Sequence, residues 1–267
     1  MKPFADPVPA DPTLEALREA FRSADRATRR RLVPALPPAE VEFAGIRMYV
    51  DPRDNYTDRM IWLDSQPPEM TSLMALTEIV EGQNAFILDI GANCGAFTVP
   101  LALAAGEGSR VIAFEPNPVM IGRLGYNLSL NGLGSKVRIE SCALGAEAGE
   151  AMLNLRTGNY GQATLNPIKE RARAGGTLVP VRPLTEFTAQ ARDHDISVLK
   201  IDVEGAEVAV MYPLLEAGGW LPDVVLMETR HAGDWDMDLV KMMADSGFEP
   251  RLEADGNTLF VHKDAAH

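Results

Sequence analysis

The sequence predicts an α/β fold in which a mostly parallel sheet is flanked by helices. Two apolar runs, Phe86–Ile90 and Arg110–Phe114, are typical of strands that are buried on both faces. A helical stretch follows each run, and strand and helix alternate in this way along much of the chain. Asp255-Gly256 is a hairpin turn signal, so we expect the sheet to end in an antiparallel C-terminal hairpin.

Residues 1–66 are expected to form an N-terminal extension of a helix and a hairpin. Asp11 and Pro12 are typical of a helix start, and apolar residues at helical spacing continue this helix to about Leu32. A hairpin is expected over Val41–Val50, and residues 51–66 are expected to be irregular. The sequence leaves open whether this extension contributes to a substrate site or forms a homo-oligomer through its helix.

The main domain is expected over residues 67–267. Its helices are expected at 67–80, 96–104, 118–130, 184–192, 204–216 and 237–246. Its strands are expected at 86–90, 110–114, 137–140, 197–201, 224–227, 248–252 and 258–262. An insertion of strands and loops at about 143–183 interrupts the alternation, with short strands at 151–155 and 177–181 and a loop at 157–166.

The composition argues against several classes of protein. The chain has 267 residues, with 25 Lys and Arg against 38 Asp and Glu, so its net charge is −13. Nucleic acid is not an expected partner, because contacts to phosphates need a basic face. The two cysteines, Cys94 and Cys142, are too few for a disulfide framework. No apolar stretch reaches the ~20 residues of a membrane span and no signal peptide is recognisable, so we expect a cytoplasmic protein without a membrane partner.

The most informative local segment is Leu88-Asp89-Ile90-Gly91-Ala92-Asn93-Cys94-Gly95, which leads from a buried strand through a tight turn into a helix. Gly91 permits the turn and lets a ligand approach the backbone. Glu115 ends the next strand, where this class of fold places an acid that holds both hydroxyls of an adenosine ribose. Together these features indicate a ligand that contains adenosine.

The same segment favours S-adenosylmethionine over NAD. Dinucleotide sites usually have Gly-x-Gly-x-x-Gly, and here Asn93 replaces the second glycine. The carboxylate of Asp89 would repel a pyrophosphate but suits a sulfonium ligand that carries an ammonium group. The chain also lacks a Tyr-x-x-x-Lys pair, although an NAD-dependent oxidoreductase on a related fold remains an alternative.

Further segments share the pattern of one family. They are Phe114-Glu115-Pro116-Asn117-Pro118, Asn127-Leu128-Ser129-Leu130-Asn131-Gly132, Cys142-Ala143-Leu144-Gly145 and, most specific, Leu199-Lys200-Ile201-Asp202-Val203-Glu204-Gly205-Ala206-Glu207, with a shorter echo at Leu226-Met227-Glu228. On these segments the chain resembles the FkbM family of S-adenosylmethionine-dependent methyltransferases over about residues 70–250. The resemblance implies a class I methyltransferase fold, which is Rossmann-like.

The resemblance also implies the residues that bind the cofactor. Four would line its methionine end: Asp89, Gly91, Asn93 and Gly95. Glu115 would bind the ribose hydroxyls with Asn117 nearby, and Ala143 would lie against the adenine edge with Cys142 beside it. Asp202 would face the amino group and the methyl group that is transferred.

Methyl transfer is an in-line displacement at a sulfonium, so it needs positioning and, for a hydroxyl acceptor, a base. The candidate catalytic residues at the expected sheet edge are Asp202, Glu204, Glu228 and His231. Each carboxylate at a helix start also has a structural explanation as a cap, and a lone histidine is often a surface loop residue. We expect no metal site, although three of the carboxylates could supply oxygen ligands.

The sequence thus predicts a methyltransferase that uses S-adenosylmethionine to O-methylate a sugar, a polyketide-like compound or another small-molecule hydroxyl. The resemblance, not the composition, suggests that class of acceptor. Two further alternatives stay open: a non-catalytic sensor of an adenosine ligand, and methylation of nitrogen or of RNA. The net charge of −13 weakens the RNA alternative.

Overall fold

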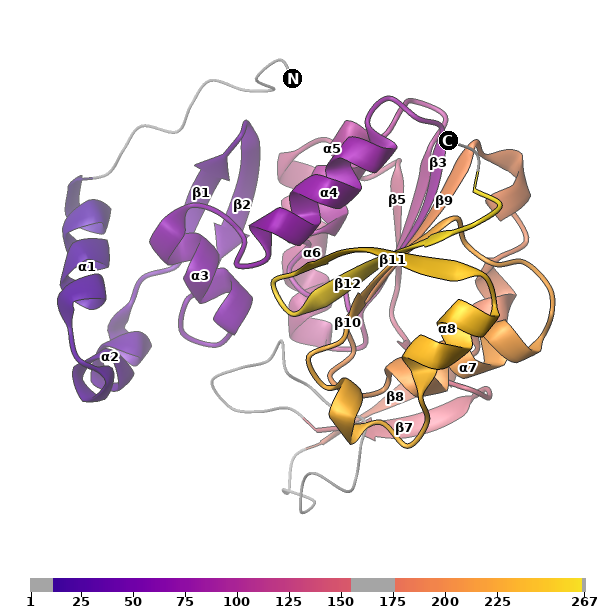
Figure 1. Cartoon of the computed structure of the whole chain (residues 1–267). Coiled ribbons are helices and arrows are strands. Elements are labelled where there is room, and N and C mark those ends of the chain that lie inside the picture. Colours follow the sequence, from indigo (N-terminus) through magenta and orange to yellow (C-terminus); the bar gives the residue numbers. More distant parts are fainter. Residues whose placement is uncertain (1–11, 155–175, 266–267) are drawn as a thin grey trace.

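A computed structural model describes residues 12–154 and 176–265, and a seven-stranded sheet lies at its centre (Figure 1). In spatial order the strands are β11 (Phe248–Ala254), β12 (Asn257–His262), β10 (Val224–Glu228), β9 (Ile196–Ile201), β3 (Ala85–Ile90), β4 (Arg110–Phe114) and β5 (Val137–Glu140). β12 is antiparallel to both of its neighbours, and the other adjacent strands are parallel. The predicted fold class, with its antiparallel C-terminal hairpin, is confirmed.

Helices cover both faces of this sheet, because its central strands are apolar on both sides. Successive residues of β3 show the alternation: Ile87 packs with the residues of one cluster, and Phe86 and Leu88 pack with those of the other. The first face is covered by α4 (Met70–Val80), α5 (Thr98–Ala104) and α6 (Pro118–Leu130). The second is covered by α7 (Glu207–Glu216) and α8 (Leu239–Asp245).

Two expectations for the helices of this domain are wrong. The helix expected at 184–192 is replaced by two 3₁₀ turns, η3 (Leu184–Phe187) and η4 (Ala191–Asp193). Leu184 and Phe187 are both buried, and 3₁₀ geometry places residues three apart on the same side. The helix expected from Glu204 begins at Glu207 instead, because Glu204 and Gly205 have φ angles of +52° and +100°. A third short turn, η5 (Ala232–Asp234), follows β10.

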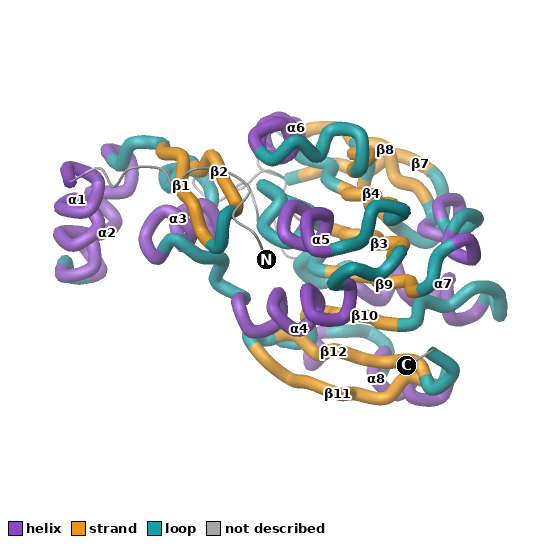
Figure 2. Tube along the Cα trace, turned by 90° about the horizontal axis from the view of Figure 1, so that it is seen from above, coloured by secondary structure: helices purple, strands orange, loops and turns teal. Residues whose placement is uncertain are grey.

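The N-terminal segment lies to one side of the sheet (Figures 1 and 2). Its elements are α1 (Pro12–Ser23), α2 (Arg26–Leu32), η1 (Val33–Ala35), β1 (Ala39–Phe43), β2 (Ile46–Val50) and α3 (Tyr56–Asp64). The predicted hairpin is confirmed as β1 and β2. The single helix expected to Leu32 is wrong, because Asp25 interrupts it and accepts a 2.9 Å hydrogen bond from the backbone of Thr28 as the N-cap of α2.

Residues 51–66, expected to be irregular, contain α3. Trp62 of this helix is fully buried, and its Asp58 forms a buried ion pair with Arg123 of α6. α3 therefore depends on contacts made by distant parts of the chain, which a local pattern does not reveal.

Asn127 of α6 and Asn131, the residue that caps its C-terminal end, hold the hairpin against the sheet domain. The side chain of Asn127 accepts a 2.7 Å hydrogen bond from the backbone N–H of Tyr49 and donates one of 3.2 Å to its carbonyl. Asn127 also donates to the carbonyl of Cys94 at 2.8 Å, and Asn131 bonds the backbone of Arg47 in a similar way. The segment 127–132 thus connects β2 to the loop that follows β3.

A small three-stranded sheet lies beside the main one, in the order β6 (Ala143–Leu144), β8 (Thr177–Arg182), β7 (Gly149–Leu153). β7 and β8 correspond to the two short strands expected in this region, while the loop expected at 157–166 lies outside the described residues. Across the part of the chain that is described, no helix has the length and apolar character needed to cross a membrane.

Candidate functional site

The site is built at the carboxyl ends of β3, β4 and β9, where the loop after β3 passes between its two neighbours. The backbone N–H of Gly91 donates to the carbonyl of Phe114 at 3.1 Å, and that of Asp202 donates to the carbonyl of Ile90. Gly91 has a φ angle of +78°, and a Cβ at this position would lie 1.9 Å from the carbonyl oxygen of Asp202. The loop therefore requires glycine for both its conformation and its close contact with β9.

Glu115 lies at the end of β4 and holds the loops on either side of it. Its two carboxylate oxygens accept hydrogen bonds from the backbone N–H groups of Asn93 and Asn117, each at 2.8 Å. Burial raises the pKa of Glu115 to about 7, although both hydrogen bonds act to lower it. A carboxylate has about four acceptor positions, so two remain for hydroxyl groups of a ligand.

A pocket, which we call the glycine-loop pocket, opens beside Gly91 and Glu115. Its described lining residues are Ile90, Gly91, Asn93, Phe114, Glu115, Pro116, Cys142, Ala143, Leu144, Leu153, Asp202, Val203, Glu204 and Ala206. It therefore brings together six of the nine residues expected to bind the cofactor: Gly91, Asn93, Glu115, Cys142, Ala143 and Asp202.

The other three of these residues lie outside the lining of the pocket. Asn117 is fully buried and its side chain caps α6, accepting a hydrogen bond from the backbone of Val119 at 3.0 Å. Gly95 has a φ angle of +94° and packs against Leu124, whose side chain would lie 2.8 Å from an added Cβ. Asp89 is fully buried and accepts a hydrogen bond from Thr98.

Asp89 is linked to the pocket through Lys200, which the sequence analysis did not single out. The Nζ atom of Lys200 lies 3.7 Å from Asp89 and 3.6 Å from Asp202, and it donates to the carbonyl of Gly91 at 3.2 Å. Burial acts to lower the pKa of Lys200, but the two carboxylates outweigh it and raise the pKa above its ordinary value. A lysine inside the apolar run Val198–Ile201 was the signal available in the sequence.

A second pocket, which we call the acidic pocket, adjoins the first. Its described lining residues are Asn55, Tyr56, Thr57, Pro68, Glu69, Asn93, Asp202, Glu204, Glu228, Arg230 and Asp255. Asn93, Asp202 and Glu204 line both pockets. Two of the expected catalytic residues, Asp202 and Glu204, thus stand at the junction of the two pockets, and Glu228 faces the second alone.

The N-terminal segment contributes to the acidic pocket at a point the sequence did not reveal. The side-chain amide of Asn55 donates a 2.7 Å hydrogen bond to Asn93, and its own carbonyl oxygen has no hydrogen-bond partner among the described residues. Glu69 reaches the same pocket from the start of α4, where burial and the charge of Asp202 raise its pKa. Asn55 and Glu69 are separated from the glycine loop by many residues, so their spacing in the sequence did not indicate that they belong to the site.

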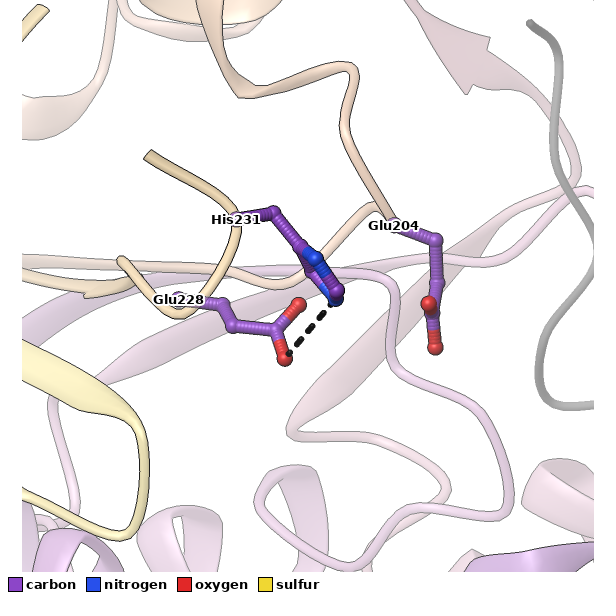
Figure 3. A group of neighbouring side chains, drawn as sticks. All are labelled: Glu204, Glu228 and His231. Atoms are coloured by element: carbon purple, nitrogen blue, oxygen red, sulfur yellow. Dashed lines mark ion pairs between the residues drawn. The ribbon is translucent and has the colours of Figure 1, made fainter. Parts of the chain in front are cut away.

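Glu204, Glu228 and His231 come together beside the acidic pocket, which the two glutamates line (Figure 3). One ligand-type atom from each lies within 4.8 Å of those of the other two. Glu228 is the last residue of β10 and is 6% exposed; burial, followed by the charges of Asp202 and Glu204, raises its pKa to about 8. The Nε2 atom of His231 lies 4.0 Å from Oε1 of Glu228.

Both cysteines are buried and free. Burial raises the pKa of Cys142 to about 11, and it also raises the pKa of Cys94 well above its ordinary value. Neither thiol is therefore ionised near neutral pH, and neither has the character of a nucleophile.

Comparison with known proteins identifies the family. The model of the methyltransferase FkbM domain matches residues 89–249, which is more than half of the chain. Methyltransferase sdnD of Sordaria araneosa is 28% identical over 193 residues, covering 62% of this chain and 74% of the relative. Methyltransferase 1 of Beauveria bassiana is 29% identical over 162 residues, covering 54% of this chain and 64% of the relative.

A solved structure of a methyltransferase FkbM from Methylobacillus flagellatus is 14% identical, with a TM-score of 0.44. The two proteins align over 78% of this chain, which spans only 55% of the length of the solved one. The match to the family model covers the glycine loop, Glu115 and the segment from Asp202 to Glu228. The chain therefore belongs to the FkbM family of methyltransferases.

Proposed function

We propose that this chain uses S-adenosylmethionine to methylate a hydroxyl group of a small molecule, such as a sugar or a polyketide-like compound. The observation that carries the proposal is the junction of the two pockets. Asn93, Asp202 and Glu204 line both, so a methyl donor in one would lie next to an acceptor in the other. S-adenosylmethionine supplies an electrophilic methyl group on a sulfonium centre.

The glycine-loop pocket fits the adenosyl part of this cofactor. Gly91 lines this pocket, and its missing side chain lets the loop lie directly against the backbone of Asp202, which also lines the pocket. Glu115 retains acceptor positions for two ribose hydroxyls. Cys142, Ala143 and Leu144 supply a mostly apolar wall for an adenine ring. Carboxylates at Asp202 and Glu204 favour a sulfonium and oppose the pyrophosphate of NAD.

The acidic pocket fits the acceptor side. Carboxylates of Glu204 and Glu228 are placed to accept a hydrogen bond from a hydroxyl, and one of them, Asp202 or His231 would take the proton as the new O–C bond forms. The ion pair with Lys200, at 3.6 Å, would help to hold the carboxylate of Asp202 at the boundary between donor and acceptor. The main work of the protein is positioning, since the cofactor provides the reactive group.

The acidic pocket also argues against the alternative that the chain is a non-catalytic sensor of an adenosine ligand. A sensor needs one pocket for its ligand and no second cavity beside it. The second pocket of this chain is polar, adjoins the first through three residues, and contains candidate bases.

The test is a calorimetric titration of the full chain with S-adenosylmethionine, S-adenosylhomocysteine and NAD. We expect micromolar binding of the first two and no heat from NAD. Glu115→Gln is expected to weaken the binding at least tenfold, and the matched change at an exposed position, Glu216→Gln, to leave it unchanged. Binding of NAD alone would overturn the proposal.

The acceptor class is tested next, with S-adenosylmethionine that carries a labelled methyl group. Small-molecule hydroxyl and amine acceptors are offered in parallel, and the product bond is identified by mass spectrometry. Transfer to amines alone would contradict O-methylation while leaving methyl transfer intact.

A further inference from the structure

The strongest feature left unassigned is the cluster of Glu204, Glu228 and His231. The three residues come from two separate parts of the sheet edge: Glu204 from the turn after β9, and the other two from the end of β10 and the turn that follows it. In Figure 3 the imidazole of His231 extends between the two carboxyl groups. With the potential ligand atoms within 4.8 Å of one another, a single ion could contact all three.

Glu228 supplies an independent indication that something cationic belongs here. Glu228 is 94% buried, and its Oε2 atom has no hydrogen-bond partner among the described residues. For its Oε1 atom, the ion-pair partners among residues 12–154 and 176–265 are both distant: Arg230 at 3.8 Å and His231 at 4.0 Å. A buried carboxylate without hydrogen bonds is costly, so native proteins usually pair such a group or use it to hold a metal.

The charges around Glu228 strengthen this indication. Asp202, Glu204, Glu69 and Asp255 line the same pocket, and Arg230 is the cationic residue among its described lining residues. The guanidinium of Arg230 lies 3.8 Å from Glu228, but it also donates a 2.8 Å hydrogen bond to the carbonyl of Asp255, and its side chain is 57% exposed, so solvent screens its charge. The pocket therefore carries more negative charge than its own residues neutralise.

The donor set indicates which cation fits. Mg²⁺ and Ca²⁺ prefer oxygen ligands alone, whereas an imidazole together with carboxylates suits first-row ions such as Mn²⁺, Fe²⁺ and Zn²⁺. Three protein ligands leave coordination positions open, as in catalytic rather than structural sites. Those positions would face the acidic pocket, because Glu204 and Glu228 both line it.

We propose that Glu204, Glu228 and His231 bind one divalent first-row metal ion, which holds an oxygen of the acceptor in the acidic pocket. This role in the reaction rests on the proposed function, whereas the binding of the ion does not. A metal ion acts as a Lewis acid on a hydroxyl that binds to it, so the hydroxyl releases its proton more readily. With Glu204, Glu228 and His231 engaged as ligands, Asp202 is the candidate base that would take this proton. The sequence alone led us to expect no metal, because the spacing of the three residues matches no familiar ligand motif.

The experiment titrates the metal-free full chain with Mn²⁺ and follows the signal of the free hydrated ion by electron paramagnetic resonance. We expect one Mn²⁺ per chain. Glu228→Gln and His231→Ala should each weaken binding at least about tenfold, the smallest loss seen when even the surroundings of a metal ligand are changed. The matched controls are Glu249→Gln, at an exposed position of β11, and His194→Ala, near the start of β9; both should bind as the unchanged chain does.

Circular dichroism and thermal melting show whether each variant is folded, and Glu228→Gln keeps the shape of the side chain. The proposal is overturned if the unchanged chain shows no saturable binding of Mn²⁺, or if the two site variants bind Mn²⁺ as well as their controls.

Calorimetry with S-adenosylmethionine runs in parallel without metal. Binding of the cofactor without Mn²⁺ binding refutes only the metal site, and Mn²⁺ binding without cofactor binding refutes only the proposed function.

A methyl-transfer assay with and without a chelator distinguishes the metal site from an alternative in which the acidic pocket binds an ammonium group of the acceptor. If the metal holds the acceptor, the chelator should reduce transfer to a hydroxyl acceptor at least tenfold and Mn²⁺ should restore it. Full activity in the presence of the chelator would overturn the role of the metal in the reaction.

Discussion

Replacing Gly91 by alanine tests the contact on which the glycine-loop pocket is built. The added Cβ would lie 1.9 Å from the carbonyl oxygen of Asp202, whereas carbon and oxygen atoms of neighbouring strands approach to about 3.3 Å. The ends of β3 and β9 would therefore have to separate by more than about 1 Å. The φ angle of +78° adds roughly 1–2 kcal/mol for a residue with a side chain.

Gly132 provides the matched control. Its φ angle is +69°, close to that of Gly91, but an added Cβ would meet no atom within 4 Å. Gly132→Ala should therefore cost only the backbone contribution, roughly 1–2 kcal/mol, or a few degrees in Tm for a domain of this size. Gly91→Ala should cost at least about 4 kcal/mol, because a collision with backbone is added to the same strain.

The two variants are compared by thermal melting and by calorimetry with S-adenosylmethionine. We expect Gly91→Ala to lower Tm by about twice as much as Gly132→Ala or more, and to weaken cofactor binding at least tenfold. Gly132→Ala should bind the cofactor normally. Equal losses of Tm and equal affinities in the two variants would refute the close contact between Gly91 and Asp202.

Three other predictions concern buried polar groups. Burial holds the pKa of Glu115 at about 7 against an ordinary 4.5, so its contribution to stability is present below pH 4.5 and is lost as pH rises through 7. In urea melts at a series of pH values, the unchanged chain should lose up to about 3 kcal/mol over this range relative to Glu115→Gln. Asn127→Ala removes its bonds to β2 and Cys94 and should cost about 2–3 kcal/mol by urea unfolding; a loss near zero would show that water replaces them. Lys200→Met leaves the buried charge of Asp89 without its partner and should lower the free energy of unfolding in urea by about 3–5 kcal/mol. Adding Asp89→Asn to this variant should restore part of that stability, and no restoration would contradict the pairing.

The strands of the central sheet could be predicted because their sequence signal is local. Runs such as Phe86–Ile90 are apolar on both faces, which only a strand covered by helices requires. The glycine loop was predictable for the same reason, since the turn, its glycine and the following helix are contiguous. Glu115 could be placed because the end of the next parallel strand falls at the same edge of the sheet.

The errors arise where distant contacts decide the local structure. α3 exists because Trp62 is buried and Asp58 pairs with Arg123, about 65 residues further along the chain. The 3₁₀ turns at 184–193 form because Leu184 and Phe187 pack on the sheet at a spacing of three. The residues that these two segments pack against lie elsewhere in the chain. The sequence of α3 therefore showed no helical pattern, and the sequence of residues 184–193 was wrongly interpreted as an α-helix.

The acidic pocket was the least predictable part of the site. Asp202, Glu204 and Glu228 were expected at the sheet edge, but Asn55 and Glu69 reach the pocket from segments with no motif of their own. Asp255 reaches it from the C-terminal hairpin, whose turn signal indicates a turn but no site. Carboxylates on surface loops are common, so their residue type alone carries no information about a site. Only the fold shows that these loops converge.

The origin of the two pocket walls has a practical consequence for engineering. The described lining of the glycine-loop pocket lies wholly within residues 90–206, inside the segment that matches the family. Tyr56, Thr57, Pro68 and Asp255 of the acidic pocket lie outside that segment. If the proposed function holds, a combinatorial library randomised at these four codons would sample new acceptors, while every described residue that lines the glycine-loop pocket stays as it is. The three residues that line both pockets, Asn93, Asp202 and Glu204, would stay unchanged in such a library.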